Sequence, residues 1–279
     1  EIEFPKELDL IRKHLKKIVS SKLSFLKNQG YTSNIEPSKT QILKMQSFLQ
    51  SEIASGKYEV APAIIKLAQI LKIEHAIELL ESQSIKAFYT YLEKLFNEAK
   101  KSKSKSVKEL SLEPLLIQAY HESKSLLENN SIYPKLSVLE NLLNVKEKVI
   151  IFTNFRDTAK DISSHLKISN KIFVGQAKKQ GLGLTQKKQA EIINEFRESK
   201  FQILIATSVA EEGLDIPKVD KVIFYEPTAS AIRNIQRRGR TGRLDEGQVQ
   251  ILCMKNTRDM GYKWSAYHKE KRMYDILSK

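Results

Sequence analysis

The chain has 279 residues, of which 41% are hydrophobic and 29% are charged, a balance typical of a soluble globular protein with one large or two medium domains. No apolar run approaches the length of about 18 residues that crosses a bilayer, so the sequence predicts no membrane span. The formal net charge of +14 favours a polyanionic partner such as nucleic acid, with anionic membranes or solubility alone as the alternatives.

The cysteine and histidine content narrows the chemistry. A single cysteine, Cys253, excludes an intrachain disulfide and fits a reducing cytoplasm. The five histidines show no pairing at helical spacing, so no metal site is expected. Residues 1–5 lack both an initiator Met and a basic segment followed by an apolar run, which favours an internal piece of a longer protein.

Residues 1–128 are predicted to form an all-α domain. Apolar residues recur there at the i, i+3, i+4 spacing of helices, and Pro37-Ser38 supplies an N-cap signal. A Lys/Ser run at 100–106 interrupts this half, and its like charges predict a solvated, mobile loop, with a phosphate contact as the alternative. Five helices are expected, near residues 8–26, 38–53, 62–79, 88–96 and from 114 onward.

From Tyr133 the pattern changes, and residues 129–279 are predicted to form an α/β domain. Short β-branched runs alternate with helical segments, which indicates βαβ units and a parallel sheet covered on both faces. Ligands on such sheets bind where the strands end, and the unusual residues of this sequence lie there. The runs are 149–152, 172–174, 203–206, 222–225 and 249–252, with helices expected at 157–166 and 186–197.

The most unusual segment is Gln236–Arg243, which reads QRRGRTGR. Its glycines permit close backbone approach, and its arginine forks match phosphate oxygens at any relevant pH. A solvated basic turn is the alternative for an arginine-rich stretch, but it does not explain this particular string. The segment resembles motif VI of superfamily 2 helicases.

The resemblance to motif VI implies roles for three residues. Arg240 and Arg243 match arginine fingers that reach the γ-phosphate of ATP bound on a neighbouring RecA-like domain. Such fingers are worth roughly 10³–10⁵ in the rate of nucleotide hydrolysis. Gln236 matches a position that senses the γ-phosphate or its attacking water.

Two further segments that begin in predicted strands resemble motifs of the same helicases. Ala206–Pro217 is similar to motif V, by which Gly213 and Asp215 would lie on the nucleotide side; alone, a strand followed by a glycine turn is common. Val149–Arg156 is similar to motif IV, with a helix N-terminus capped by Thr153 or Asn154 as an alternative that is compatible with it. Residues 175–177, after the second predicted strand, look like motif IVa, although a plain turn fits them equally well. Together these matches imply nucleic-acid contacts by Phe155, Arg156, Gly175, Gln176, Thr207 and Ser208.

Longer strings narrow the resemblance to one lineage, the archaeal helicase-associated endonuclease for fork-structured DNA (Hef) and its eukaryotic relative, the Fanconi anaemia group M helicase. They are FVGQA at 173–177, FYEP at 224–227 and the tail at 258–273. The match covers the second half nearly throughout. It is looser over the first half, which resembles the helical insertion between the two RecA-like domains of that family.

The resemblance implies an ATP-dependent helicase or translocase that acts on forked, branched or duplex DNA in DNA repair or at replication forks. We expect it in the cytoplasm, associated with the nucleoid. No GxxxxGK[ST] string occurs, so the chain lacks a phosphate cradle. ATP with Mg²⁺ would be bound mainly by an N-terminal RecA-like domain that is expected in cis, upstream of Glu1.

Several expectations follow for the chain alone. It should bind no ATP appreciably, show no ATPase activity and cleave no DNA. A duplex-RNA helicase of the innate-immune type and a non-catalytic DNA-binding scaffold are the competing interpretations. Trp264 is expected to be a packing anchor near the C-terminus, with base stacking as the alternative.

Overall fold

The structure is a computed structural model that describes residues 1–277 except 35, 176–182, 208–216, 218 and 228–247; for 269–277 it describes the backbone alone. The chain divides into two compact units. The helical unit comprises Pro5–Leu80 and Ile85–Ser131. The sheet unit comprises Glu1–Phe4, Glu81–Ser84 and Ile132–Lys279. The expected domain boundary at 128/129 stays a prediction, because this division also assigns two earlier segments to the sheet unit.

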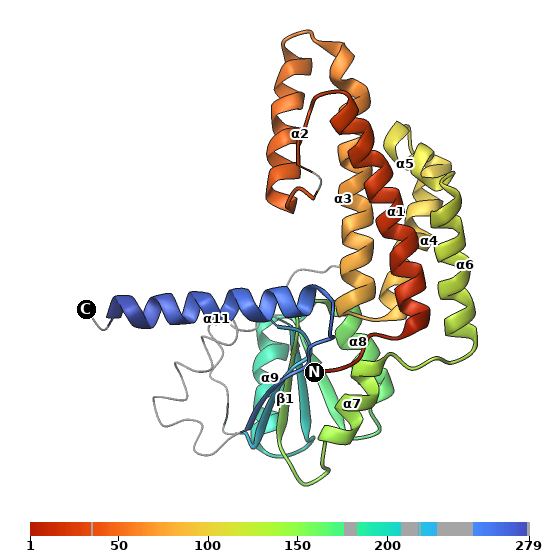
Figure 1. Cartoon of the computed structure of the whole chain (residues 1–279). Helices are drawn as coiled ribbons and strands as arrows, with labels where there is room; N and C mark the ends of the chain where they lie inside the picture. Colours follow the sequence, from red (N-terminus) through yellow and green to blue (C-terminus); the bar gives the residue numbers. More distant parts are fainter. Residues whose placement is uncertain (35, 176–182, 208–216, 218, 228–247, 278–279) are drawn as a thin grey trace. The chain divides into compact units, whose positions relative to one another are not determined.

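The helical unit is built around α3, whose residues are apolar on all sides and largely buried, as expected for a central helix. Helix α6 packs against α1, α4 and α5, so the longer helices run alongside one another (Figure 1). The helices are α1 (Lys6–Asn28), α2 (Lys39–Ala54), α3 (Ala61–Ser82), α4 (Ile85–Lys101), α5 (Lys105–Ser111) and α6 (Pro114–Glu128), with a short 3₁₀ helix at Tyr58–Val60.

The start of α2 follows the predicted signal. Ser38 accepts a hydrogen bond from the Gln41 amide, and the Gln41 side chain accepts one from the Ser38 amide, forming a capping box. The loop expected over the Lys/Ser run 100–106 is shorter than predicted: α4 continues to Lys101 and α5 begins at Lys105, which leaves residues 102–104 between the helices. Val107 and Leu110 are fully buried, and this apolar anchoring holds the segment in a helix despite its charge.

The sheet unit confirms the predicted α/β class. Its strands are β1 (Val149–Thr153), β2 (Asn170–Phe173), β3 (Ile203–Thr207), β4 (Lys221–Phe224) and β5 (Gln248–Ile251). They form one five-stranded sheet in the order β2-β3-β1-β4-β5, and every pairing is parallel. All five strands lie where the β-branched runs predicted them, with shifts of one or two residues at the ends.

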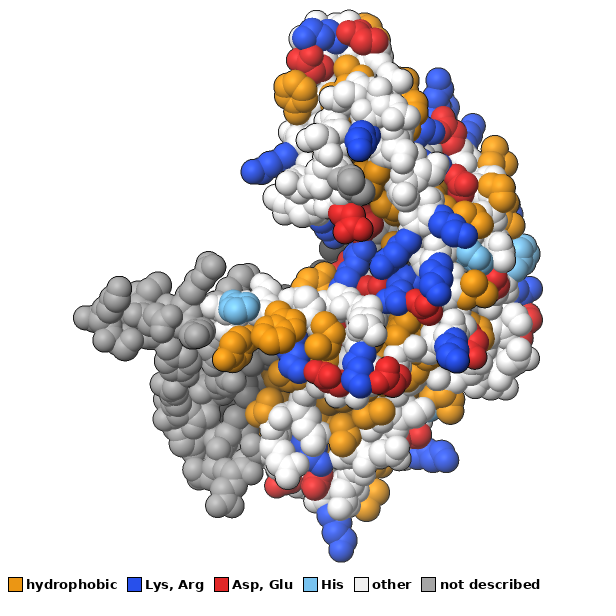
Figure 2. Space-filling view, in the orientation of Figure 1, with side chains coloured by type: hydrophobic (Ala, Val, Ile, Leu, Met, Phe, Trp, Pro, Cys, Tyr) orange, Lys and Arg blue, Asp and Glu red, His pale blue; other side chains and the backbone are white. Residues whose placement is uncertain are grey.

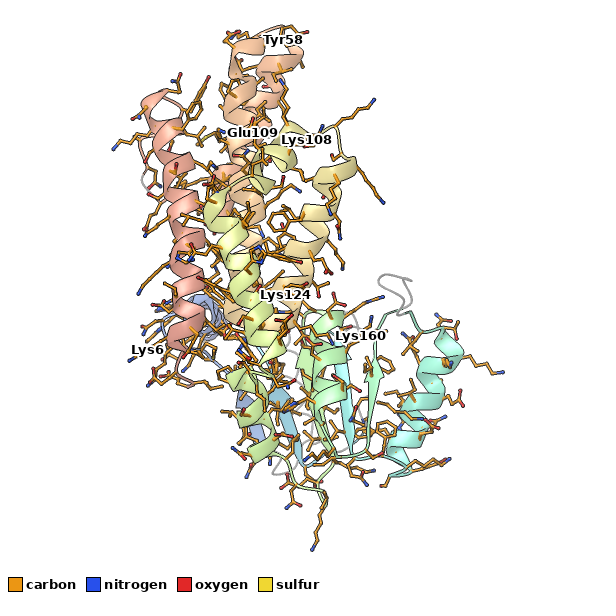
Figure 3. All side chains as sticks on the ribbon, turned by 90° about the vertical axis from the view of Figure 1, so that its right-hand side faces the viewer. Lys6, Tyr58, Lys108, Glu109, Lys124 and Lys160 are labelled. Atoms are coloured by element: carbon orange, nitrogen blue, oxygen red, sulfur yellow. The ribbon has the colours of Figure 1, made fainter. Side chains whose placement is uncertain are left out.

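Helices cover both faces of this sheet. Helix α9 (Gln186–Arg197) packs Ile193 and Phe196 into a buried cluster with Phe152 and Phe224 on one face. Residues that alternate with these along the strands point to the other face, where α8 (Arg156–His165) packs against β1, β2 and β3. Figure 3, which labels Lys160 on α8, shows the strands between these two helices.

Two helices of the sheet unit were not predicted, α7 (Pro134–Leu142) and α11 (Arg258–Leu277). The N-terminal segment also joins this unit, because Ile2 pairs in parallel with Met254 just beyond β5. The expectation that Trp264 is a packing anchor is wrong, since this residue of α11 is 58% exposed. Within the described residues, no helix combines the length and apolar character that a membrane span requires.

Candidate nucleotide and nucleic-acid site

The carboxyl edge of the sheet gathers the described residues of the expected site. Because all five strands are parallel, their carboxyl ends meet at one edge. Thr153 at the end of β1 is in register with Thr207 at the end of β3, and Phe173 at the end of β2 is in register with Ala206. The segments resembling motifs IV, IVa and V therefore leave the sheet from three adjacent strands.

Two of the expected nucleic-acid contacts, Arg156 and Gly175, lie together. The Arg156 guanidinium donates from Nη2 to the Gly175 carbonyl oxygen at 3.1 Å. The same carbonyl accepts the Leu184 amide at 3.4 Å. This hydrogen bond ties the first residue of α8 to the backbone just after β2, so motifs IV and IVa are held as one surface.

Phe155 is the N-cap residue of α8, and it is half-buried. The capping alternative finds little support: no side chain caps α8, and Thr153 Oγ1 only accepts the Phe155 amide at 3.5 Å. The amide of Asn154 instead donates to the side chain of Glu226, which follows β4. The start of α8 is thus fixed from a neighbouring strand and not by its own residues.

Thr207, an expected phosphate contact, is only 2% exposed. Its hydroxyl oxygen is buried and has no hydrogen-bond partner within the described part of the chain. Buried hydroxyls are normally hydrogen-bonded, so this one fits a group whose partner is a ligand or a residue outside the described ranges.

The remaining expected site residues lie outside the described residues, and their roles stay predictions. Motif V follows β3 directly in the chain, and motif VI falls between Pro227 and Gln248, where the described backbone stops and resumes. The residues concerned are Gln176, Ser208, Gly213, Asp215, Gln236, Arg240 and Arg243.

Glu226 is the buried carboxyl that sequence reasoning missed. It is 3% exposed, and its Oε1 accepts the Thr153 hydroxyl at 3.1 Å as well as the Asn154 amide. Burial raises its pKa to about 7, and the charge of Lys135 opposes that rise. FYEP signalled a lineage, but nothing in the string indicated that its glutamate is buried.

A second missed feature is a buried polar network around Lys135. Its Nζ lies 2.6 Å from Asp259 Oδ2, and neither side chain is exposed. The same nitrogen donates to the carbonyl oxygens of Ser82 and Tyr225 at 3.1 and 2.9 Å, and Ser82 Oγ donates to Asp259 at 2.8 Å. The short segment between α3 and α4 is therefore built into the sheet unit.

Two further side chains tie this segment to the site. Tyr225 donates from its hydroxyl to the Gln83 carbonyl at 3.1 Å, and Thr158 of α8 donates to the Gln83 side chain at 2.6 Å. No periodicity or motif marks these residues, because isolated polar residues in an apolar context look alike in a sequence whether they are exposed or paired.

That ATP with Mg²⁺ is bound mainly by another domain stays a prediction, because the residues of motifs V and VI lie outside the described ranges. The sequence has no phosphate cradle, and among the residues that the structure describes no group of His, Cys, Asp or Glu side chains could hold a metal ion.

Comparisons with known proteins agree with this architecture. Residues 134–245 match the helicase conserved C-terminal domain, and residues 7–125 match a family described as the helical bundle of an ATP-dependent RNA helicase. A protein of Methanocaldococcus jannaschii named as an ATP-dependent RNA helicase is 37% identical over 289 residues, covering 99% of this chain and 35% of the relative. The ATP-dependent DNA helicase MPH1 of Pyricularia oryzae is 37% identical over 222 residues, covering 72% of this chain and 20% of the relative.

A solved structure decides the lineage. The Pyrococcus furiosus Hef helicase domain superimposes with a TM-score of 0.82 and 38% sequence identity, over 95% of this chain and 56% of that chain. The chain belongs to the Hef-type superfamily 2 helicases. This Hef-type chain spans about a third of the M. jannaschii relative and about half of the Hef helicase domain.

The helical unit of this Hef-type chain carries a basic face on α1. Between Asp9 and Glu36 the sequence has six basic residues and no acidic one. Lys13, Lys16, Lys17 and Lys27 are exposed on α1, together with Ser20, Ser21 and Ser24. Figure 2 shows Lys and Arg side chains gathered over this part of the bundle. Lys13 forms an ion pair with Asp9 at 2.9 Å, and the exposed Lys16, Lys17 and Lys27 with their neighbouring serines suit contacts to phosphates.

Proposed function

We propose that this chain is the second RecA-like domain and the helical insertion of an ATP-dependent motor that acts on forked or branched DNA. The observation that carries the proposal is the carboxyl edge of the sheet, where the described starts of motifs IV, IVa and V lie side by side on β1, β2 and β3. The same edge is where ligands bind on parallel α/β sheets.

One set of residues at this site is proposed to contact the nucleic-acid strand, and another set is proposed to face the nucleotide. Phe155, Arg156, Gly175, Gln176, Thr207 and Ser208 are the proposed contacts to the tracking strand. Gly213 and Asp215 would face the nucleotide, and Gln236, Arg240 and Arg243 would face its γ-phosphate. The arginines supply positive charge to a phosphate held by a neighbouring RecA-like domain, which also provides the Mg²⁺ ligands. Hydrolysis then loosens the grip between the domains, and alternation moves the strand.

The helical unit would supply a second grip on DNA. From Lys13 to Lys27 the basic face of α1 is about 21 Å long at 1.5 Å per residue, roughly two-thirds of a turn of a duplex. Contacts of this type read the backbone and shape of the duplex, not its sequence. This fits a protein that selects branched DNA by geometry, as part of DNA repair or fork processing.

Duplex RNA is the second candidate substrate, because the M. jannaschii relative is named as an RNA helicase whereas MPH1 is named as a DNA helicase. Lysine contacts to phosphates do not distinguish the two. Discrimination needs contacts to the 2′-hydroxyls, so competition between DNA and RNA duplexes of equal length separates the candidates.

Substitution of the proposed arginine fingers tests the motor directly. In the full protein that carries this chain, Arg240→Ala and Arg243→Ala should each lower DNA-stimulated ATP hydrolysis by about 10³-fold with little change in DNA affinity. Arg197→Ala, at the C-terminal end of α9, is the matched control and should retain the rate.

The chain alone provides the complementary measurement. Without a phosphate cradle it should show no ATP hydrolysis above background. Robust hydrolysis by the purified chain that disappears with Arg240→Ala would contradict the proposed division of labour, as would full ATPase activity in the Arg240→Ala protein.

A further inference from the structure

Glu226 occupies a position that the proposed strand contacts do not explain. It lies two residues beyond the end of β4, whose last residue, Phe224, is in register with Phe152 of β1. Tyr225 continues the pairing, since its amide donates to the Phe152 carbonyl oxygen at 2.9 Å. Glu226 therefore lies beside Thr153 and Asn154, which immediately precede Phe155 and Arg156 in the chain.

The carboxyl group of Glu226 holds Thr153 and Asn154 by two hydrogen bonds. Its Oε1 accepts the Thr153 hydroxyl at 3.1 Å and the main-chain amide of Asn154. Helix α8 has no side-chain cap of its own. Glu226 does not cap the helix, because Asn154 precedes the N-cap residue Phe155, but it fixes the backbone immediately before the first turn.

The backbone of Glu226 is itself held firmly. The preceding carbonyl oxygen, that of Tyr225, accepts a hydrogen bond from the buried Lys135 Nζ at 2.9 Å, and the Tyr225 hydroxyl donates to the Gln83 carbonyl. Both side chains are fully buried. These contacts restrain the backbone that carries the Glu226 side chain. Its carboxyl group is therefore a rigid support for the loop after β1.

Two polar atoms next to this support have no partner within the described residues. They are Glu226 Oε2 and the hydroxyl oxygen of Thr207, each nine-tenths buried or more. Thr207 is in register with Thr153, so the two orphaned atoms belong to the strands on either side of β1. Buried polar groups are normally hydrogen-bonded, so the partners of these two atoms are a ligand or residues outside the described ranges.

We propose that Glu226 is a positioning residue that sets the loop of Asn154, Phe155 and Arg156 against the bound nucleic-acid strand. The proposal rests on the proposed function of this loop. In this role Glu226 acts on the bound strand through the loop that it holds. Its acceptor oxygen fixes the Asn154 amide and thereby the direction in which α8 begins, and Arg156 then reaches Gly175.

Ionisation of Glu226 modulates this support, because a carboxylate accepts hydrogen bonds more strongly than a carboxylic acid does. Burial raises the pKa of Glu226 to about 7. Among the described residues, the charged and titratable groups around it are Lys135 of α7, Asp259 of α11, Tyr225 beyond β4 and Tyr133 before α7. The support is therefore firmer above pH 7 than below it.

The experiment is DNA-stimulated ATP hydrolysis by the full protein, measured as a function of single-stranded DNA concentration from pH 6 to pH 8.5. Glu226→Ala should raise the DNA concentration for half-maximal stimulation about ten-fold, the factor that loss of a charge-assisted hydrogen bond commonly brings, with kcat within about two-fold. Glu226→Gln retains an acceptor oxygen and should stay near the wild type, without the change near pH 7 that the wild type shows.

Two further variants separate positioning from stability. Thr153→Val removes one of the two hydrogen bonds and should give a smaller rise than Glu226→Ala in the DNA concentration required. Ile205 of β3 is fully buried and in register with Ile151 and Ile172, so Ile205→Val is a mildly destabilising control that should leave that concentration unchanged.

The outcomes are distinct. If Glu226→Ala does not fold, Thr153→Val and the pH profile of Glu226→Gln carry the test. The inference is overturned if these variants match the wild type in DNA requirement and pH profile, or if Glu226→Gln is as impaired as Glu226→Ala. A wild-type protein with no DNA-stimulated ATPase would instead overturn the proposed function.

Discussion

Glu226 shows how a single buried residue links stability to the site. Its pKa rises from 4.5 to about 7, chiefly because burial penalises the charged form. The folded state then holds this proton more tightly than the unfolded chain does. Its contribution to the free energy of unfolding is present below pH 4.5 and is lost as the pH rises towards 7, an effect of roughly 3 kcal/mol at full shift.

Glu226→Gln removes that titration, so we predict that the difference in stability between variant and wild type depends on pH. The variant should gain on the wild type as the pH rises from 5 to 8. Thermal unfolding midpoints of the two proteins, measured across this range in one buffer series, provide the check. Two curves that stay parallel from pH 5 to pH 8 would show that Glu226 titrates normally.

A buried ion pair holds the segment between α3 and α4 to the rest of the sheet unit. Lys135 and Asp259 form an ion pair with neither side chain exposed. Lys135→Met leaves the Asp259 carboxylate buried and uncompensated, which costs about 3–5 kcal/mol of the free energy of unfolding. We expect Lys135→Met with Asp259→Asn to recover part of this loss, because the charge is removed while one acceptor oxygen remains for either Ser82 Oγ or the Met254 amide.

Urea unfolding of these variants tests the role of the ion pair. The matched control is Lys200→Met, which breaks an ion pair with Glu198 whose side chains are both 60% exposed and should leave the unfolding midpoint unchanged. Equal effects of Lys135→Met and Lys200→Met would mean that the buried network contributes no more than a surface pair.

The elements also show what a sequence can and cannot predict. All five strands and the helices α8 and α9 follow from periodicity, and the capping box at Ser38 follows from local residue types. Helix α5 was not foreseen, because the lysines that predicted a loop gave no hint that Val107 and Leu110 are buried. Burial of Lys135, Asp259 and Glu226 depends on contacts between residues far apart in the chain, which leave no local pattern.

The same division applies to the candidate site. Motif positions after strands predicted correctly that Arg156, Gly175 and Thr207 share one edge of the sheet. The hydrogen bonds from Glu226 and its neighbours that support this edge could not be predicted without the three-dimensional structure. Trp264 was expected to be a packing anchor near the C-terminus, but it lies on an exposed part of α11, because a helix leaves part of its surface to solvent whatever residue lies there.

At the scale of the whole molecule, the uneven charge distribution predicts where DNA binds the helical unit. Replacement of Lys16, Lys17 and Lys27 by Gln removes three exposed cations of α1. We expect weaker binding to duplex DNA of any sequence and a shallower dependence of log Kd on log salt, by up to roughly three phosphate contacts.

A matched triple variant controls for net charge. Lys146, Lys167 and Lys200 are exposed and lie before β1, β2 and β3, at the amino edge of the sheet opposite the candidate site. Their replacement by Gln changes the charge equally and should weaken DNA binding far less. Equal losses of affinity and of salt slope in the two triple variants would assign DNA binding to overall charge.

The measurement that tests the central claim most directly is titration of this chain against labelled forked DNA, linear duplex DNA, single-stranded DNA and duplex RNA at two salt concentrations. If the chain is part of a motor that acts on branched DNA, it should bind forked DNA more tightly than linear duplex DNA, single-stranded DNA and duplex RNA. This preference should remain at the higher salt concentration. Equal binding to all four that disappears together at the higher salt would contradict the claim, because the chain would then contribute only positive charge.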